Sequence, residues 1–565
     1  MNDIRRTILW VIFGFSMVLL WDQWQVHNGQ KATFFPSPAK PELVTSATPA
    51  AAMPAGQVTD GSNQIAGGAA AQPSPKRERV VVSTDLLKLD FDTEGGSLVK
   101  TEFLKVRDLT DQSKNFVLLD QSKTRVYLAQ TGLIAGAAGL AFPTHKTVMS
   151  VASSERELKD GAKDLTVRFE STEVGGVKLV KTYTLTRGSY GIGVKHEVVN
   201  TGPTAVSPRL YVQLVRDGVV ETDNSMIMGP SSYTGPAIYT EAKKYHKVEF
   251  KEIDNNKAEI DKNSSNGYVA MVQHYFVSAW LLADGIKREN FVRKLPDTQP
   301  AQYAVGMISD FDELAPGARK VMDATLFVGP QEEKVLEAMA PGLELVKDYG
   351  VLTILAKPLF WLLDKLHSGL QNWGWAIVAL VVLLKMAFYW LNAKAYASMA
   401  KMKAINPRIM EMRERLKDSP QQMQQEMMRI YREEKVNPMG GCLPIVIQIP
   451  VFIALYWVLL SSVEIRNAPW IMWITDLSAK DPYYILPLLM TMSTMLQTAL
   501  NPAPPDPMQA KMMWILPLVF SVMFFVFPAG LVLYWLTNNI LSIAQQWVIN
   551  TRMGVPPQFN LPKFR

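Results

Sequence analysis

Residues 373–391 read WGWAIVALVVLLKMAFYWL, an apolar run whose only charged side chain is Lys385. About 20 such residues, wound into a helix, cross the hydrocarbon core of a bilayer, so we expect this run to span a membrane. Further runs of similar character follow along the chain: Leu443–Val463, Tyr483–Leu500, Met512–Phe527 and Gly530–Ile549. The C-terminal third therefore predicts a polytopic α-helical membrane protein with a five-helix core at 372–550.

Another apolar run lies near the N-terminus, where residues 7–21 are uncharged and follow Arg5 and Arg6. Bulky residues come after it instead of a small-residue cleavage site, so 1–24 predicts an uncleaved signal anchor and brings the number of spans to six. Segment 392–442 carries ten lysine and arginine residues, and the tail at 551–565 has basic residues and no acid. Because cytoplasmic loops are enriched in lysine and arginine, both termini are expected in the cytoplasm.

The long region between the first two spans then lies on the opposite side of the membrane. Residues 25–79 are rich in Pro, Ala, Gly, Ser and Gln, which predicts a flexible linker. Residues 80–341 show short runs of alternating apolar residues separated by turn signals. One such run places Val177, Leu179, Tyr183 and Leu185 on a common strand face. This pattern predicts an antiparallel β-sandwich domain.

The composition excludes several kinds of chemistry. A single cysteine permits neither an internal disulfide nor a cysteine-based metal site, and six scattered histidines show no metal-ligand spacing. His196-Glu197 begins a zinc-protease motif, but Asn200 stands where the second histidine is needed. No phosphate-binding loop or nucleophile elbow occurs in the chain. We therefore predict no catalytic residues, no metal and no cofactor, and interpret the β-domain as a binding or scaffolding module.

Leucines at helical spacing mark residues 349–371 as an amphipathic helix that leads directly into the span at 373–391. Such a helix fits the membrane interface. The alternative is a helix packed on the β-domain, and we favour the interface because a span follows at once.

Lys385 is the most informative single residue. A lysine inside a span costs roughly 2.5–3.5 kcal/mol on insertion scales, so it usually faces a polar cavity or a partner. The other apolar runs supply no acidic partner, but they supply polar groups such as Gln448 and Asn538. A water-filled groove open toward the cytoplasm is the functional hypothesis. The alternative is that the long side chain of Lys385 reaches out to the cytoplasmic interface.

Segment 392–442 predicts a cytoplasmic helical hairpin that holds eight methionines. Packing of its two arms is the ordinary explanation for its apolar stripe. Methionine is also the flexible choice for surfaces that accept varied apolar partners. The basic residues beside the stripe would suit lipid headgroups or ribosomal RNA, without implying specific nucleic-acid binding. The candidate substrate- or ribosome-facing residues are Met399, Met402, Met423, Met427 and Ile430.

Several short motifs carry a family resemblance. VNPMGGCLP at 436–444, DPYYILP at 481–487 and FPAGLVLYW at 527–535 resemble the membrane protein insertases of the Oxa/Alb/YidC family. The similarity is dense over 349–550. The anchor and the large external domain match the Gram-negative type, whose external domain is periplasmic.

The resemblance implies a membrane protein insertase and chaperone that inserts and folds inner-membrane proteins, alone or with the Sec translocon, without hydrolysing nucleotide. Its groove would open to the cytoplasm and the lipid, with Lys385 at a position where many members carry arginine. Trp535 stands where the family has a groove tyrosine next to Tyr534, so a hydroxyl is absent there. The implied periplasmic domain is an all-β supersandwich resembling sugar mutarotases, although a shared fold does not transfer activity. The implied partners are nascent inner-membrane proteins, the Sec translocon, ribosome or signal recognition components, and lipids.

Two other functions compete with this one. A secondary transporter could use Lys385 as an intramembrane substrate site, but such transporters usually show internal repeats, which are not seen here. A membrane-anchored sugar-modifying enzyme would leave the methionine-rich hairpin unexplained.

Overall fold

The structure is a computed structural model that describes residues 77–108, 111, 113–122, 125–135, 140–219, 233–416, 419–434, 443–501, 507–554 and 559. The predicted signal anchor at 1–24 and nearly all of the linker at 25–79 lie outside the described residues, as does most of the motif at 436–444. The described chain forms a β-domain that ends at Lys347 and a helical unit that begins at Asp348.

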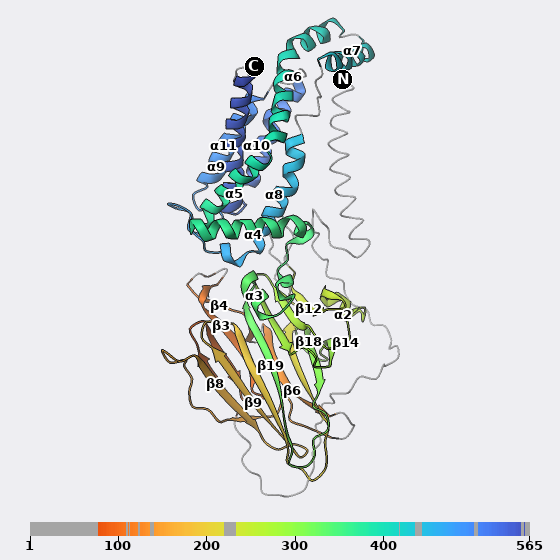
Figure 1. Cartoon of the computed structure of the whole chain (residues 1–565), viewed down its shortest axis with the longest axis vertical. Helices are drawn as coiled ribbons and strands as arrows, with labels where there is room; N and C mark the ends of the chain where they lie inside the picture. The colour runs from red at the N-terminus through yellow and green to blue at the C-terminus, as the bar shows by residue number, and fades with distance from the viewer. Residues whose placement is uncertain are drawn as a thin grey trace. The chain divides into compact units, whose positions relative to one another are not determined.

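The β-domain consists of two antiparallel sheets (Figure 1). The ten-stranded sheet has the order β1-β2-β3-β6-β11-β18-β17-β14, with β4 beside β3 and β5 beside β6. Its strands are β1 (Arg79–Ser83), β2 (Leu87–Asp92), β3 (Ser97–Arg107), β4 (Asn115–Val117), β5 (Asp120–Gln121), β6 (Val126–Ala135), β11 (Pro208–Asp217), β14 (Asn263–Ser264), β17 (Arg288–Lys294) and β18 (Gln302–Asp310).

The nine-stranded sheet has the order β13-β12-β15-β16-β19-β10-β9-β8-β7. Its strands are β7 (Met149–Val151), β8 (Asp164–Ser171), β9 (Val177–Thr186), β10 (Gly191–Asn200), β12 (Gly235–Thr240), β13 (Lys244–Lys247), β15 (Tyr268–Gln273), β16 (Phe276–Leu282) and β19 (Arg319–Pro330). The short helices α2 (Phe250–Asp254), α3 (Glu333–Met339) and η1 (Leu343–Val346) complete the domain.

Strand β9 shows how the sequence builds this sandwich. Val177, Leu179, Tyr183 and Leu185 are all buried on the face that alternation assigns to the core. Lys181 falls on the same face and is fully buried as well. The antiparallel β-sandwich predicted from the sequence is confirmed, with a charged residue type in its interior that the pattern did not predict.

The helical unit packs around one apolar core, with α4 lying crosswise at one end of the bundle and the α6–α7 hairpin at the other (Figure 1). Its elements are η2 (Gly350–Leu352), α4 (Thr353–Leu370), α5 (Trp373–Ala387), α6 (Tyr389–Arg415), α7 (Pro420–Glu433), α8 (Leu443–Ser461), η4 (Val463–Ile465), α9 (Ile485–Leu500), α10 (Pro507–Met523) and α11 (Ala529–Arg552).

The end of the bundle beside α4 is closed by close glycine–tryptophan contacts. A Cβ placed on Gly374, in the first turn of α5, would lie 2.2 Å from the Trp470 ring. Gly350 has a φ of +66°, and a Cβ there would lie 2.5 Å from the ring of Trp457. Neither position has room for a larger residue, so the indole rings pack directly on the backbone.

Within the described residues, no single helix is both long and apolar enough to cross a membrane alone. Residues 373–387 and 389–402, in α5 and α6, meet that requirement only together, and they are bent by 68°. The apolar run at 373–391, predicted as one span, is thus divided between α5 and the start of α6. The chain turns at Phe388, whose φ of −93° and ψ of 11° lie outside the α-helical region.

Helices α9 and α11 are joined by side-chain hydrogen bonds in the apolar interior. The Asn539 amide donates to Ser493 Oγ at 3.2 Å and to Thr494 Oγ1 at 3.0 Å. About two turns further along α11, Gln546 Nε2 donates to Asn501 Oδ1 at 3.1 Å. These bonds hold two otherwise apolar helices in one register.

Replacing Asn539 with leucine is expected to lower the stability of the helical unit by about 1–2 kcal/mol, because Ser493 and Thr494 lose a donor inside the bundle. The measurement is the thermal unfolding midpoint of the detergent-solubilised chain. Ile540→Leu, at an exposed position of the same helix, serves as the control. Equal midpoints for the two variants would contradict this role for Asn539.

Candidate functional site

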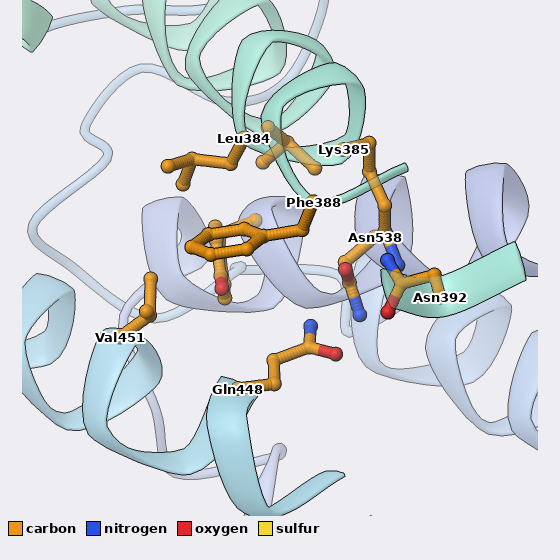
Figure 2. A pocket seen from close by; sticks show the side chains of 9 residues that line it. Leu384, Lys385, Phe388, Asn392, Gln448, Val451 and Asn538 are labelled. Atoms are coloured by element: carbon orange, nitrogen blue, oxygen red, sulfur yellow. The ribbon is translucent and has the colours of Figure 1, made fainter. Parts of the chain in front are cut away.

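A cavity lined by both polar and apolar side chains lies inside the helical unit, where α5, α6, α8 and α11 approach one another. It encloses about 400 Å³, including space open to the outside. The residues that line it are Val381, Leu384, Lys385, Phe388, Asn392, Gln448, Val451, Tyr534 and Asn538. Figure 2 shows Lys385, Asn392, Gln448 and Asn538 directed toward the same space, with the Phe388 ring on the side of Leu384 and Val451.

Lys385 is held at the cavity wall by a neutral partner. Its ammonium donates to Ser542 Oγ on α11 at 2.6 Å, and Ser542 in turn donates to the carbonyl of Asn538 at 2.7 Å. The lining that the structure describes contains no other charged residue. The positive charge is therefore anchored to a hydroxyl and has no carboxylate partner among the described residues of this site.

The opposite wall is built from amide and hydroxyl groups. Tyr534 forms a side-chain hydrogen bond with Gln448, which joins α11 to α8 across the cavity. Gln448 and Asn538 are uncharged and can both donate and accept hydrogen bonds. Groups that can donate and accept hydrogen bonds thus come together inside a bundle whose core is otherwise apolar.

Four of the five residues predicted for the groove lie together here: Lys385, Gln448, Tyr534 and Asn538. Trp535 does not line this cavity, and its ring packs against Phe452 and Phe524 at centroid distances of 4.6 and 5.4 Å. Trp535 follows Tyr534 by about 100° around α11 and lies on the side of Phe452 and Phe524. The groove role of Trp535 stays a prediction.

Sequence reasoning did not place Phe388 and Asn392 in the site. Both follow Lys385 at helical spacing, three and seven residues later, so the periodicity of the lining continues through the bend. Asn392 was taken only as the first residue of the hairpin. In the structure α6 begins earlier, at Tyr389, and brings Asn392 to the cavity.

The hairpin of α6 and α7 has a small apolar core of its own. Ile405, Ile409, Met412 and Ile430 are buried between its arms, and Met402, Met423 and Met427 pack against them. Met399 is half-buried outside this cluster. The structure thus gives four of the five predicted contact residues a packing role. Met410 and Met428 are 53% and 47% exposed instead, so these are the methionines that can meet a partner directly.

Replacing both Met423 and Met427 with serine is expected to raise the protease sensitivity of the hairpin several-fold, because polar groups would replace apolar contacts between the arms. The matched control is Met410→Ser with Met428→Ser, which changes the same chemistry on the exposed side. The control pair should leave protease sensitivity unchanged. Unchanged protease sensitivity in the first pair would rule out its packing role.

Comparisons with known proteins agree with this architecture. A family described as the YidC periplasmic domain matches residues 79–362, and one described as the 60Kd inner membrane protein matches residues 365–555. A membrane protein insertase YidC from Cupriavidus metallidurans is 54% identical over 559 residues, covering 98% of each chain. Another from a Janthinobacterium species is 49% identical over 573 residues, covering 98% of this chain and 100% of its own.

Among solved structures, an active YidC insertase with its first transmembrane domain resolved covers 83% of this chain and 92% of its own, at a TM-score of 0.38 and 17% identity. A galactose mutarotase-like protein from Lactobacillus casei covers 44% of this chain and 100% of its own, at a TM-score of 0.30 and 11% identity.

The family matches and full-length relatives define an inner-membrane protein that carries a periplasmic β-domain ahead of its helical unit. The chain belongs to the YidC family of membrane protein insertases.

Proposed function

We propose that this chain inserts proteins into the inner membrane and that the cavity beside Lys385 receives the hydrophilic segment of each client. The observation that carries the proposal is an ammonium group that shares a cavity with amide and hydroxyl side chains inside an apolar bundle, with no carboxylate partner among the described lining residues. Ionisable groups in such places are seldom structural, because their desolvation costs several kcal/mol. The role is one of transport and folding, not of catalysis.

In this mechanism Lys385 attracts an acidic tail of the client into the inner half of the membrane. The attraction is strong because Coulomb energy rises as the dielectric constant falls. Gln448, Asn392 and Asn538 replace water around the tail by donating and accepting hydrogen bonds. The client's apolar segment of about 20 residues then partitions into lipid, and burial of that segment with the membrane potential supplies the free energy.

The proposed topology has six spans, a five-helix core and both termini in the cytoplasm. Helix α4 would then lie at the periplasmic interface. Its buried side carries Leu359 and Leu363, while Ile354 and Trp361 on the opposite side are 87% and 61% exposed. Two apolar sides on one helix suit a position between a protein core and the headgroup region.

The proposed partners are nascent inner-membrane proteins, the Sec translocon, the ribosome or signal recognition components, and membrane lipids. The hairpin supports a cytoplasmic contact, since it presents exposed basic side chains. Arg408 on α6 clamps the arms together through Glu433 and Glu434 on α7, at 3.0 and 2.9 Å.

A depletion strain tests the proposed function. Expression of this chain should restore the membrane level of a short single-span client with an acidic periplasmic tail. A restored solute uptake without restored client insertion would favour a transporter and overturn the proposal.

A further inference from the structure

The ten-stranded sheet has an outward face, on the side away from the nine-stranded sheet. Leu98 pairs with Ala129, and the Tyr127 hydroxyl reaches across the sandwich to the carbonyl of Met271 at 3.0 Å, so these side chains face inward. Neighbouring residues along each strand therefore point outward. On the adjoining strands β3, β6 and β11 these include Ser97, Val99, Leu128, Gln130, Tyr211 and Gln213.

A pocket of about 480 Å³, counting space open to the outside, lies over this face. Val99 and Leu128, which are 3% and 4% exposed, belong to its lining and to a small apolar cluster on the outward face. Ser97, Gln130 and His145 supply polar groups to the same pocket.

A directed chain of hydrogen bonds fixes the amide of Gln130. Arg293 can only donate, and its Nη2 lies 3.1 Å from Gln213 Oε1, so the oxygen of Gln213 faces Arg293. Gln213 Nε2 then donates to Gln130 Oε1 at 2.9 Å. Gln130 is left with its amide hydrogens available, and the structure records no acceptor for them among the described residues.

The tautomer of His145 follows from Tyr211. The Tyr211 hydroxyl accepts the backbone N–H of His145 at 2.9 Å and lies 2.5 Å from the His145 Nδ1 atom. Because Nδ1 is the acceptor that the structure offers for the hydroxyl proton, Nε2 carries the hydrogen of the ring. Burial lowers the pKa of His145 to about 4, with a further contribution from nearby cations, so the ring is neutral near pH 7.

Ser97 provides a third donor. The residue is 3% exposed, and its Oγ has no hydrogen-bond partner among the described residues. A buried hydroxyl without a partner is destabilising, and a hydrogen bond to a ligand oxygen would offset that cost. The carboxylates at the rim are already occupied, since Arg77 bridges Asp92 at 2.7 Å and Glu94 at 3.0 Å.

We propose that this pocket binds a small carboxylate ligand whose oxygens accept hydrogen bonds from Ser97 Oγ, Gln130 Nε2 and His145 Nε2. Three donors around one pocket call for an acceptor-rich ligand. Lys181, Lys146 and Arg293 act electrostatically on His145, and a positive charge on each favours an anion there, while Arg77 offsets the Asp92 and Glu94 carboxylates of the same lining. The site is independent of the cavity at Lys385.

Isothermal titration of the full chain in detergent with succinate tests the site. Dimethyl succinate, glucose and inorganic phosphate are the comparison probes. Gln130→Leu and Ser97→Ala should each weaken succinate binding at least tenfold. Gln425→Leu, the same change at an exposed position of α7, should leave the Kd unchanged. Protease resistance of the β-domain verifies that each variant is folded.

Succinate binding that the two pocket variants weaken would support the proposal. Binding that neither variant alters would place the ligand elsewhere and overturn it, as would the absence of succinate binding to the folded chain. Stronger binding of glucose, phosphate or the neutral ester would also overturn it, by assigning the pocket to a different class of ligand.

Discussion

Replacing Lys385 with glutamate is expected to reduce insertion of clients with acidic tails at least tenfold, while Lys385→Arg should retain most activity. Two unit charges 4 Å apart interact by about 4 kcal/mol at an effective dielectric constant of about 20, and each 1.4 kcal/mol corresponds to a factor of ten. Reversing the charge turns this attraction into repulsion. The measurement is the protease-protected fraction of a radiolabelled client in inverted vesicles.

Lys394→Glu is the matched control, because Lys394 is exposed on α6, where its ammonium lies 3.6 Å from the centre of the Trp390 ring. It should insert the same clients at the parental rate. Clients whose tails carry no charge should be affected least by Lys385→Glu. If Lys385→Glu inserts acidic-tailed clients as well as the parent, the charge has no part in insertion.

Lys181 should make the stability of the β-domain rise steeply with pH. Its ammonium is fully buried and donates to the carbonyls of Gly95 and Thr131, both at 2.6 Å. Burial lowers the pKa of Lys181 from 10.5 to about 7. Between these values the folded domain holds the amine neutral while the unfolded chain binds a proton. Unfolding therefore takes up a proton, and stability rises with pH across this window.

The expected slope is about 1.4 kcal/mol per pH unit in the middle of the window, or roughly 3–4 kcal/mol between pH 7 and 10. Pulse proteolysis of the full chain in urea at a series of pH values measures it. Lys181→Met should remove this slope. Lys178→Met, on the solvent side of the same strand, should keep it. A pH-independent difference between parent and Lys181→Met would show that Lys181 is not titrating in this range.

Local periodicity was sufficient to predict much of this molecule. Alternating apolar residues predicted the β-domain, and a single charge in an apolar run pointed to Lys385. Both signals are local, because burial and desolvation depend on the type of residue at each position. Gln448 and Asn538 were found because polar groups are conspicuous in apolar helices. Their position beside Lys385 in one cavity depends on how α5, α8 and α11 pack together. A shared groove was one of two alternatives that the sequence left open for Lys385.

The sequence alone did not predict the bend at Phe388 or the outward-facing pocket, because neither has a local signal. Residues 384–392 contain neither proline nor glycine, so no local signal marks the bend. The pairing of Gln130 with Gln213 joins residues 83 positions apart. Such a register is set by the whole sheet and not by either strand alone.

The glycine–tryptophan contacts beside α4 make the two ends of α5 unequal in their freedom to move. Gly374 and Lys385 lie on the same helix, about 16 Å apart at 1.5 Å per residue. One end of α5 is pressed against an indole ring with no slack, while the other end faces rotatable lysine, asparagine and glutamine side chains. Any widening of the space beside α5 is therefore confined to its Lys385 end, because the Gly374 end has no room to move.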